Sequence, residues 1–289
     1  MIRLIYPLLI LFRRDANSGM CRRGITICLL FSFIWFIFLS EIVASPYTIY
    51  FYNPETNINN FALLKSEFDK YLSGYGPFTF QPFSDRKTFE KFVDKKRDGI
   101  FLLSSWHYQY LKEKIPIEPV YVGISKGKPT QRKILFVKEN IMSIESLKGR
   151  SIASSGSEEY TKNILLRMLG KEKVSIVNSL KILTVPKDID ALMAFGFGMA
   201  NAALTTEHTK AKLLTINPKL CDMLKELAGT ETYLQIVAAP KQINEDIQRL
   251  LSLVEKMTSS MGGRKNLKMI SLDGWKEVSS AEREYLEKR

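Results

Sequence analysis

Short apolar runs alternate with longer amphipathic segments along the chain after residue 46. Residues 48–53 (TIYFYN), 78–83 (FTFQPF) and 100–105 (IFLLSS) each have the length and the aromatic or β-branched content of a strand. Between the first two runs, large apolar residues recur at helical spacing over residues 61–72. Strands that alternate with helices predict an α/β fold with a mostly parallel sheet covered on both faces.

The segment SLKGRSIASSGS, residues 146–157, joins a tight turn, a short apolar strand and a hydroxyl-rich loop that opens a helix. The first backbone amides of a helix have no partner within it and lie at the positive end of its dipole, so such a loop can bind a small anion. The candidate ligand-binding residues here are Ser154, Ser155, Gly156 and Ser157. The alternative is structural, with Ser155 as the N-cap and Glu158 completing a capping box.

Further candidates lie where strands of the first half end, because ligands of open α/β sheets bind at the carboxyl ends of strands. Asn53 lies at the end of one predicted strand, and Ser104 and Ser105 at the end of another. A plain N-cap of the next helix would explain the two serines equally well. Tyr108 lies one turn into that helix, where it could close over a ligand or pack in the core.

The order of these elements resembles that of the phosphate-, phosphite- and phosphonate-binding subunits of bacterial ABC importers. The resemblance covers most of the chain, from about Tyr47 to Leu286. Besides the LKG turn and the serine loop, four segments carry it: DGIFLLSSWHYQYL (98–111), KGKPTQRKILFVKEN (126–140), DALMAFGFGMANAALTT (190–206) and IQRLLSLVEKMTSSMGGRKNLKMISLDGW (247–275). Their order, more than any one of them, indicates the family.

The resemblance implies a two-lobed, type II periplasmic binding-protein fold with a ligand cleft at the hinge. Residues 133–140 and 233–240 are the two predicted crossings between the lobes. We assign residues 46–138 and 235–289 to the first lobe and residues 139–234 to the second. Because two crossings form a hinge, the cleft between the lobes can close over a solute.

The second lobe is predicted to contain the serine loop, a strand at 174–179 (VSIVNS), a helix around 189–195 and a strand at 201–206 (NAALTT). Thr205 and Thr206 end the last of these strands and are candidates to line the cleft. Glu207 beside them could pair with an amine of the solute.

Residues 1–45 have the features of an export segment. Arg22 and Arg23 precede an unbroken apolar run from Ile25 to Leu39, and Ala44 offers a small residue for cleavage. We therefore expect a periplasmic or extracytoplasmic protein. The apolar run approaches bilayer length, so an uncleaved anchor is the alternative. Translation could also begin at Met20.

Charge and residue content exclude several functions. The formal net charge is +12, but basic residues mostly alternate with acidic ones, so a solvated surface explains them and no nucleic-acid partner is expected. Outside the export segment the cysteine is Cys221, and the histidines are His107 and His208, so neither a disulfide nor a metal site is expected. With no catalytic constellation, dinucleotide loop or Walker motif, we expect no enzyme and no cofactor.

The main hypothesis is an extracytoplasmic solute-binding protein, acting as a monomer. It would capture a small phosphate- or phosphonate-like oxyanion and present it to the membrane subunits of an ABC importer. The principal alternative is a membrane-tethered sensing or scavenging module of the same fold without a transporter partner. An enzyme of this fold is the third possibility.

Overall fold

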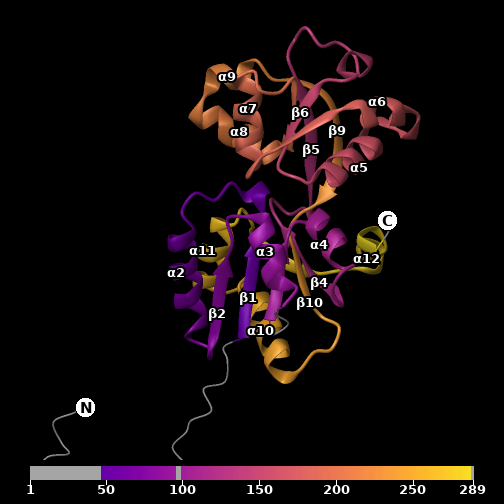
Figure 1. Cartoon of the computed structure of the whole chain (residues 1–289). Helices are drawn as coiled ribbons and strands as arrows, with labels where there is room; N and C mark the ends of the chain where they lie inside the picture. The colour runs from indigo at the N-terminus through magenta and orange to yellow at the C-terminus, as the bar shows by residue number, and fades with distance from the viewer. Residues whose placement is uncertain (1–46, 96–98, 288–289) are drawn as a thin grey trace, which may run out of the picture. The chain divides into compact units, whose positions relative to one another are not determined.

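Two mixed β-sheets, each with helices on both faces, make up the part of the chain that the computed structural model describes, residues 47–95 and 99–287 (Figure 1). The predicted export segment, residues 1–45, lies outside these described residues. Within them, no helix combines the length and the apolar content that crossing a membrane would require.

The first lobe is built on a six-stranded sheet with the strand order β11-β4-β10-β3-β1-β2. Its strands are β1 (Tyr47–Tyr52), β2 (Phe78–Pro82), β3 (Gly99–Leu103), β4 (Ile117–Ile124), β10 (Ile236–Pro240) and β11 (Gly274–Glu277). β1 pairs in parallel with β2 and β3, which confirms the three strands predicted for this region. A Cβ atom on Gly99 would lie 2.0 Å from the carbonyl oxygen of Thr48, so the approach of β3 to β1 requires glycine there.

Six helices cover this sheet in two layers. One layer consists of α2 (Phe61–Leu72), α10 (Glu245–Lys256) and α11 (Met261–Met269), and the other of α3 (Arg86–Val93), α4 (Ser105–Leu111) and α12 (Ser280–Glu287). Leu64, Phe68 and Leu72 of α2 are buried in the first layer, as their helical spacing predicts. A short 3-10 helix, η1 (Pro54–Thr56), follows β1.

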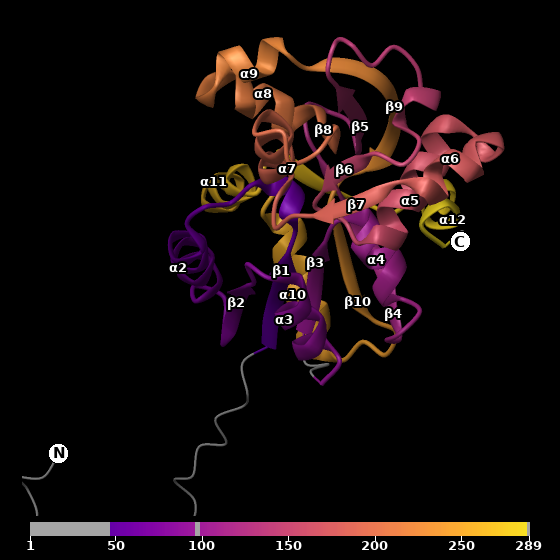
Figure 2. The same cartoon turned by 45° about the horizontal axis from the view of Figure 1, so that its top comes forward.

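The second lobe is built on a five-stranded sheet with the order β7-β6-β8-β5-β9. Its strands are β5 (Thr130–Val137), β6 (Ser151–Ser154), β7 (Lys181–Thr184), β8 (Ala202–Thr206) and β9 (Lys225–Tyr233). One face is covered by α5 (Glu158–Leu169) and α6 (Val174–Ser179), the other by α7 (Asp188–Gly196), α8 (Glu207–Ile216) and α9 (Pro218–Asp222). Two 3-10 helices, η2 (Glu145–Leu147) and η3 (Lys171–Lys173), complete the lobe. Figure 2 labels its strands β5 to β9 and its helices α5 to α9.

A mostly parallel sheet is predicted, but both sheets contain parallel and antiparallel pairs of strands. In the first sheet β10 runs antiparallel to β3 and β4, and in the second β5 runs antiparallel to β8 and β9. The terminal strand β11 also runs antiparallel to its neighbour β4. The pairing of β5 with β9, from Thr130–Tyr233 to Val137–Lys225, also places β5 in the second lobe, although the predicted boundary at residue 138 places it in the first.

The predicted strand at residues 174–179 is wrong, because these residues form the helix α6. Its β-branched residues suggested a strand, but Val177 packs in one cluster with Ile164 and Leu165 of α5. The strand of this region, β7, follows α6 and pairs with β6. The predicted helix around 189–195 and the strand ending at Thr206 are confirmed as α7 and β8.

Candidate functional site

The serine loop, residues 154–157, joins β6 to α5 and is held by contacts within the second lobe. Ser157, not Ser155, is the N-cap of α5, because its Oγ accepts a hydrogen bond from Tyr160 N at 3.1 Å. Ser154 Oγ accepts hydrogen bonds from Gly156 N at 3.2 Å and from Thr161 Oγ1 at 3.0 Å. The structural alternative, with Ser155 as the N-cap and a capping box to Glu158, is therefore wrong.

Ser155 instead contributes to a buried site at the carboxyl ends of β6 and β8. Its hydroxyl donates a hydrogen bond to Asp188 Oδ1. The other oxygen of that carboxylate, Oδ2, accepts from Thr206 N at 2.9 Å and lies 3.2 Å from Lys133 Nζ. Lys133 and Asp188 are fully buried and Ser155 is 2% exposed, so these polar groups are shielded from water.

Glu55 brings the first lobe into the same site. Its Oε1 lies 2.8 Å from Lys133 Nζ, and its Oε2 accepts from Gln131 Nε2 at 2.7 Å. We call Glu55, Lys133 and Asp188 the buried ionic cluster. Because Glu55 follows β1 whereas Lys133 lies on β5, this cluster joins the two lobes.

Electrostatics within the cluster favour a charged lysine. Burial alone would lower the pKa of Lys133, but the carboxylates of Asp188 and Glu55 raise it above its ordinary value. Burial raises the pKa of Glu55, although the ammonium of Lys133 opposes this shift. Burial also raises the pKa of Tyr160, again against the effect of Lys133.

Asn53 and Asn57 make further polar contacts beside η1. Asn53 Oδ1 caps η1 by accepting from Glu55 N at 3.0 Å, and Asn53 also borders a cavity of about 140 Å³. Asn57 Nδ2 donates to Thr209 Oγ1 at 3.0 Å, and Asn57 Oδ1 accepts from Ile189 N at 2.7 Å. The segment after β1 is therefore bonded to α7 and α8 of the second lobe.

Three candidates at the start of α4 have different environments. Ser104 is at the N-cap position but makes no capping hydrogen bond, and its Oγ is buried without a hydrogen-bond partner among the described residues. Ser105 Oγ donates to the carbonyl oxygen of Tyr233 at 2.9 Å. Tyr108 packs in the first-lobe core and donates to Glu287 Oε1 of α12 at 2.6 Å, which favours a structural role.

The candidates at the end of β8 also differ. Within the part of the chain that the structure describes, Thr205 Oγ1 is buried and has no hydrogen-bond partner, so a solute could satisfy it. Thr206 is the N-cap of α8 and accepts from Thr209 N at 3.3 Å. Glu207 is exposed, and its Oε1 accepts from Arg132 N at 3.3 Å.

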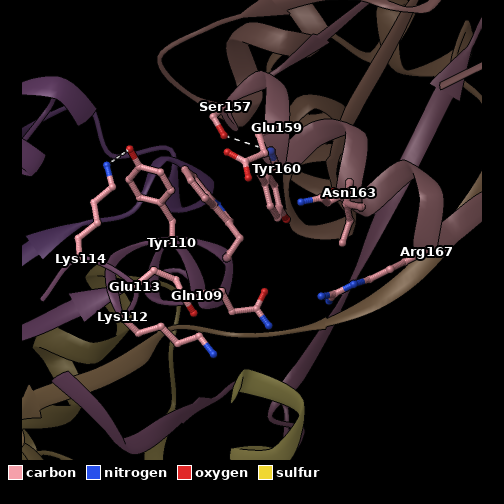
Figure 3. A pocket seen from close by; sticks show the side chains of 12 residues that line it. Gln109, Tyr110, Lys112, Glu113, Lys114, Ser157, Glu159, Tyr160, Asn163 and Arg167 are labelled. Atoms are coloured by element: carbon pink, nitrogen blue, oxygen red, sulfur yellow. Dashed lines mark hydrogen bonds between the residues drawn. The ribbon is translucent and has the colours of Figure 1, made fainter. Parts of the chain in front are cut away.

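A pocket of about 400 Å³ lies between α4 of the first lobe and α5 of the second (Figure 3). From the first lobe it is lined by Trp106, Gln109, Tyr110, Lys112, Glu113 and Lys114. From the second lobe it is lined by Ser157, Glu159, Tyr160, Asn163, Ile164 and Arg167. Figure 3 shows Asn163 and Arg167 extending from α5 toward the space that Gln109 and Lys112 border from α4. We call this space the α4–α5 pocket.

An aromatic pair joins the two sides of the α4–α5 pocket. The rings of Trp106 and Tyr160 stack with centroids 4.6 Å apart and an interplanar angle of 25°. A Cβ atom on Gly156 would lie 2.2 Å from Cδ1 of Tyr160, so the serine loop needs glycine there to let the ring lie against it. Trp106 is 4% exposed, and its Nε1 is buried without a hydrogen-bond partner among the described residues.

The cations of the α4–α5 pocket differ in how far their charged groups are exposed. Arg167 is exposed, and its Nη1 donates to Tyr285 Oη at 3.1 Å. The Lys112 side chain is only 8% exposed, and its Nζ donates to the carbonyl oxygen of Glu287 at 2.7 Å and to Glu287 Oε2 at 3.2 Å. Lys114 is exposed, and its Nζ donates to Tyr110 Oη. Since a guanidinium has five N–H donors, Arg167 can bind an oxyanion while keeping its tyrosine contact.

Sequence reasoning missed the residues that dominate both sites. Lys133 directly precedes the apolar run ILFV on the same predicted strand, and a charged residue next to a buried run is a signal that could have been followed. Asp188 directly precedes the predicted helix and has no comparable signal. Trp106 and Arg167 lie on helices from different lobes, so only the fold brings them to one pocket.

Two α/β lobes, joined by strands and enclosing a pocket between helices of both, define a type II periplasmic binding protein. The chain belongs to the family of periplasmic substrate-binding proteins of ABC phosphonate transporters, whose model matches residues 49–283. No curated protein matches the chain. The predicted family and fold class are therefore confirmed.

Solved structures with this fold are similar in architecture and distant in sequence. A Xanthomonas citri protein bound to ATP has a TM-score of 0.65 and 13% identity, over 84% of this chain and 94% of its own. A binding-protein component of a Pseudomonas aeruginosa ABC phosphonate transporter has a TM-score of 0.64 and 13% identity, over 82% and 83%. PhnD1 of Prochlorococcus marinus, in complex with methylphosphonate, has a TM-score of 0.64 and 12% identity, over 84% and 96%.

Proposed function

We propose that this protein binds an organic phosphonate, or a solute with a similar oxyanion, in the α4–α5 pocket and delivers it to the membrane subunits of an ABC importer. The single observation that carries the proposal is a 400 Å³ space lined by helices of both lobes, with Arg167 at its edge and aromatic rings at its wall. A solute there would contact both lobes at once. Binding of the solute can therefore be coupled to closure of the two lobes over it.

The lining favours a solute with two chemical parts. Trp106, Tyr160 and Ile164 offer apolar surface, which an alkyl or aryl group can cover. Arg167 and Lys114 offer exposed charged donors, which a phosphonate or sulfonate oxygen can accept from. Inorganic phosphate would use only the second set of groups, so we expect weaker binding of phosphate than of an organic phosphonate.

The relatives support this solute class. The Prochlorococcus marinus structure contains methylphosphonate and the Xanthomonas citri structure contains ATP, and both ligands carry phosphorus–oxygen groups. The family is periplasmic, so the protein would act outside the cytoplasm. We expect it to bind as a monomer and to release its solute chemically unchanged.

Thermal unfolding of the purified protein against phosphate, methylphosphonate, larger alkyl- and arylphosphonates, sulfonates and carboxylates tests this proposal. A solute at a hundred times its dissociation constant should add about 2.7 kcal/mol, or several degrees in melting temperature. We expect the largest saturable rise with an organic phosphonate. Phosphorus NMR of the recovered ligand then tests turnover. A flat response across the panel would contradict the proposed solute class, and a converted ligand would contradict a binding function without catalysis.

A further inference from the structure

The serine loop contributes to a set of donors that could hold a free oxyanion. Ser155 provides a hydroxyl, the end of β8 provides the amide of Thr206, and β5 provides the ammonium of Lys133. These groups come from three elements and converge at the carboxyl ends of the parallel strands β6 and β8. In α/β folds, small anionic ligands bind at this edge of the sheet. We call these three donors the anion cradle.

All three donors of the anion cradle are already used by a single carboxylate. Asp188 Oδ1 accepts from Ser155 Oγ, and Asp188 Oδ2 accepts from Thr206 N at 2.9 Å and from Lys133 Nζ at 3.2 Å. The exposed fraction of Asp188 is 0%, so the carboxylate is not shared with water. Asp188 is also the first residue of α7, where the helix dipole favours a negative charge.

We propose that Asp188 is a built-in anion that occupies the anion cradle and excludes free oxyanions from it. A solute oxyanion entering the cradle would have to displace the carboxylate and leave a buried negative charge without its donors. Specificity is thereby decided in the α4–α5 pocket. The exclusion depends on the contacts of Asp188 and holds whichever solute that pocket binds.

Replacing Asp188 with alanine should turn the cradle into a site for an external anion. The Asp188→Ala change removes the carboxylate and leaves space of its size, which formate fits. Asp188→Asn removes the charge but keeps the space filled, so it serves as the matched variant. Asp190→Ala removes another carboxylate from the same turn, where Asp190 Oδ2 accepts from Lys187 N at 3.1 Å.

The test is the melting temperature of these variants and of the wild type in increasing formate, with chloride at matched ionic strength. We expect a saturable rise of several degrees in Asp188→Ala and none in Asp188→Asn, Asp190→Ala or the wild type. If Asp188→Ala is unfolded in chloride, recovery of its circular dichroism in formate is the expected result.

Two outcomes would overturn the proposal. In the first, formate acts on Asp188→Ala no more than on Asp188→Asn, or fails to restore an unfolded Asp188→Ala. In the second, the wild type binds formate or phosphate saturably and Ser155→Ala loses that binding, which would show that the cradle is open to free anions. Neither outcome depends on which solute the α4–α5 pocket binds.

Discussion

The buried ionic cluster and the α4–α5 pocket both contain residues from the two lobes, but their charged side chains differ in burial and in partners. In the cluster, the ammonium of Lys133 is fully buried and contacts two carboxylates of the same chain. In the pocket, Arg167 is exposed and is bonded to a tyrosine hydroxyl. The comparison teaches that a convergence of donors marks a solute site only when those donors are not already satisfied within the chain.

The strongest way to break this comparison is to remove the cation of the buried ionic cluster. Lys133→Met leaves Glu55 and Asp188 buried without their shared partner. Removing one member of a buried ion pair costs about 3–5 kcal/mol, so we expect the free energy of unfolding to fall by that amount. Urea unfolding of the variant and of the wild type measures the change.

Lys162→Met is the matched control for this substitution. Lys162 Nζ lies 2.7 Å from Glu158 Oε1 on the surface of α5, and the glutamate side chain is 64% exposed. A pair of this kind contributes about 0.5 kcal/mol or less. Equal losses in the two variants would show that the buried ionic cluster is no more important to stability than a surface pair.

A smaller effect is expected where the serine loop supports the α4–α5 pocket. Gly156→Ala would place a methyl group against Tyr160, whose ring must move away from Trp106. Overpacking of this kind costs about 1–3 kcal/mol. Thermal unfolding should show the loss together with weaker solute binding.

Gly74→Ala is the control for Gly156→Ala. A Cβ atom there would lie 3.6 Å from the carbonyl oxygen of Tyr71, an ordinary contact. We expect its stability to stay within about 0.5 kcal/mol of the wild type. Similar losses at both glycines would refute a specific role for the space above Gly156.

The smallest effect is a dependence of stability on pH. Burial lowers the pKa of His107, although the carboxylate of Glu90 opposes the shift. The unfolded chain therefore takes up a proton near pH 6.5 and the folded chain only at lower pH, so acidification below about 6.5 destabilises the fold. When the pH has fallen below the pKa of His107 in the folded chain, the free energy of unfolding has decreased by about 1.4 kcal/mol for each unit by which folding lowers that pKa.

His107→Phe removes this titration and keeps a ring among Tyr52, Phe89 and Trp106. Urea midpoints at neutral and mildly acidic pH should therefore differ less in the variant than in the wild type. The same difference in both proteins would mean that His107 is not the group that titrates.

Much of the fold could be predicted from the sequence because its elements have local patterns. The apolar spacing of α2 and the strand-like run of β1 identify these elements without any tertiary contact. The helix α6 could not be predicted in this way, because packing of Val177 against α5 outweighs the strand preference of its β-branched residues. The antiparallel direction of β5 likewise depends on its long pairing with β9.

The site could be predicted only in part, since the sequence shows donors but not what they contact. The serine loop does end a strand and open a helix, as predicted. Ser155 donates to Asp188, which lies more than thirty positions further along the chain. Only the fold brings these two residues together. The roles of the predicted site residues in solute binding stay predictions.

The central claim is that the solute's oxyanion binds in the α4–α5 pocket and not in the anion cradle. Calorimetric titration of the best organic phosphonate into Arg167→Ala and Ser155→Ala tests it most directly. We expect Arg167→Ala to lose ten- to a hundredfold in affinity, as for a lost hydrogen bond of about 1.5–3 kcal/mol to a charged group, and Ser155→Ala to bind like the wild type. Unchanged affinity in Arg167→Ala together with a large loss in Ser155→Ala would contradict the claim.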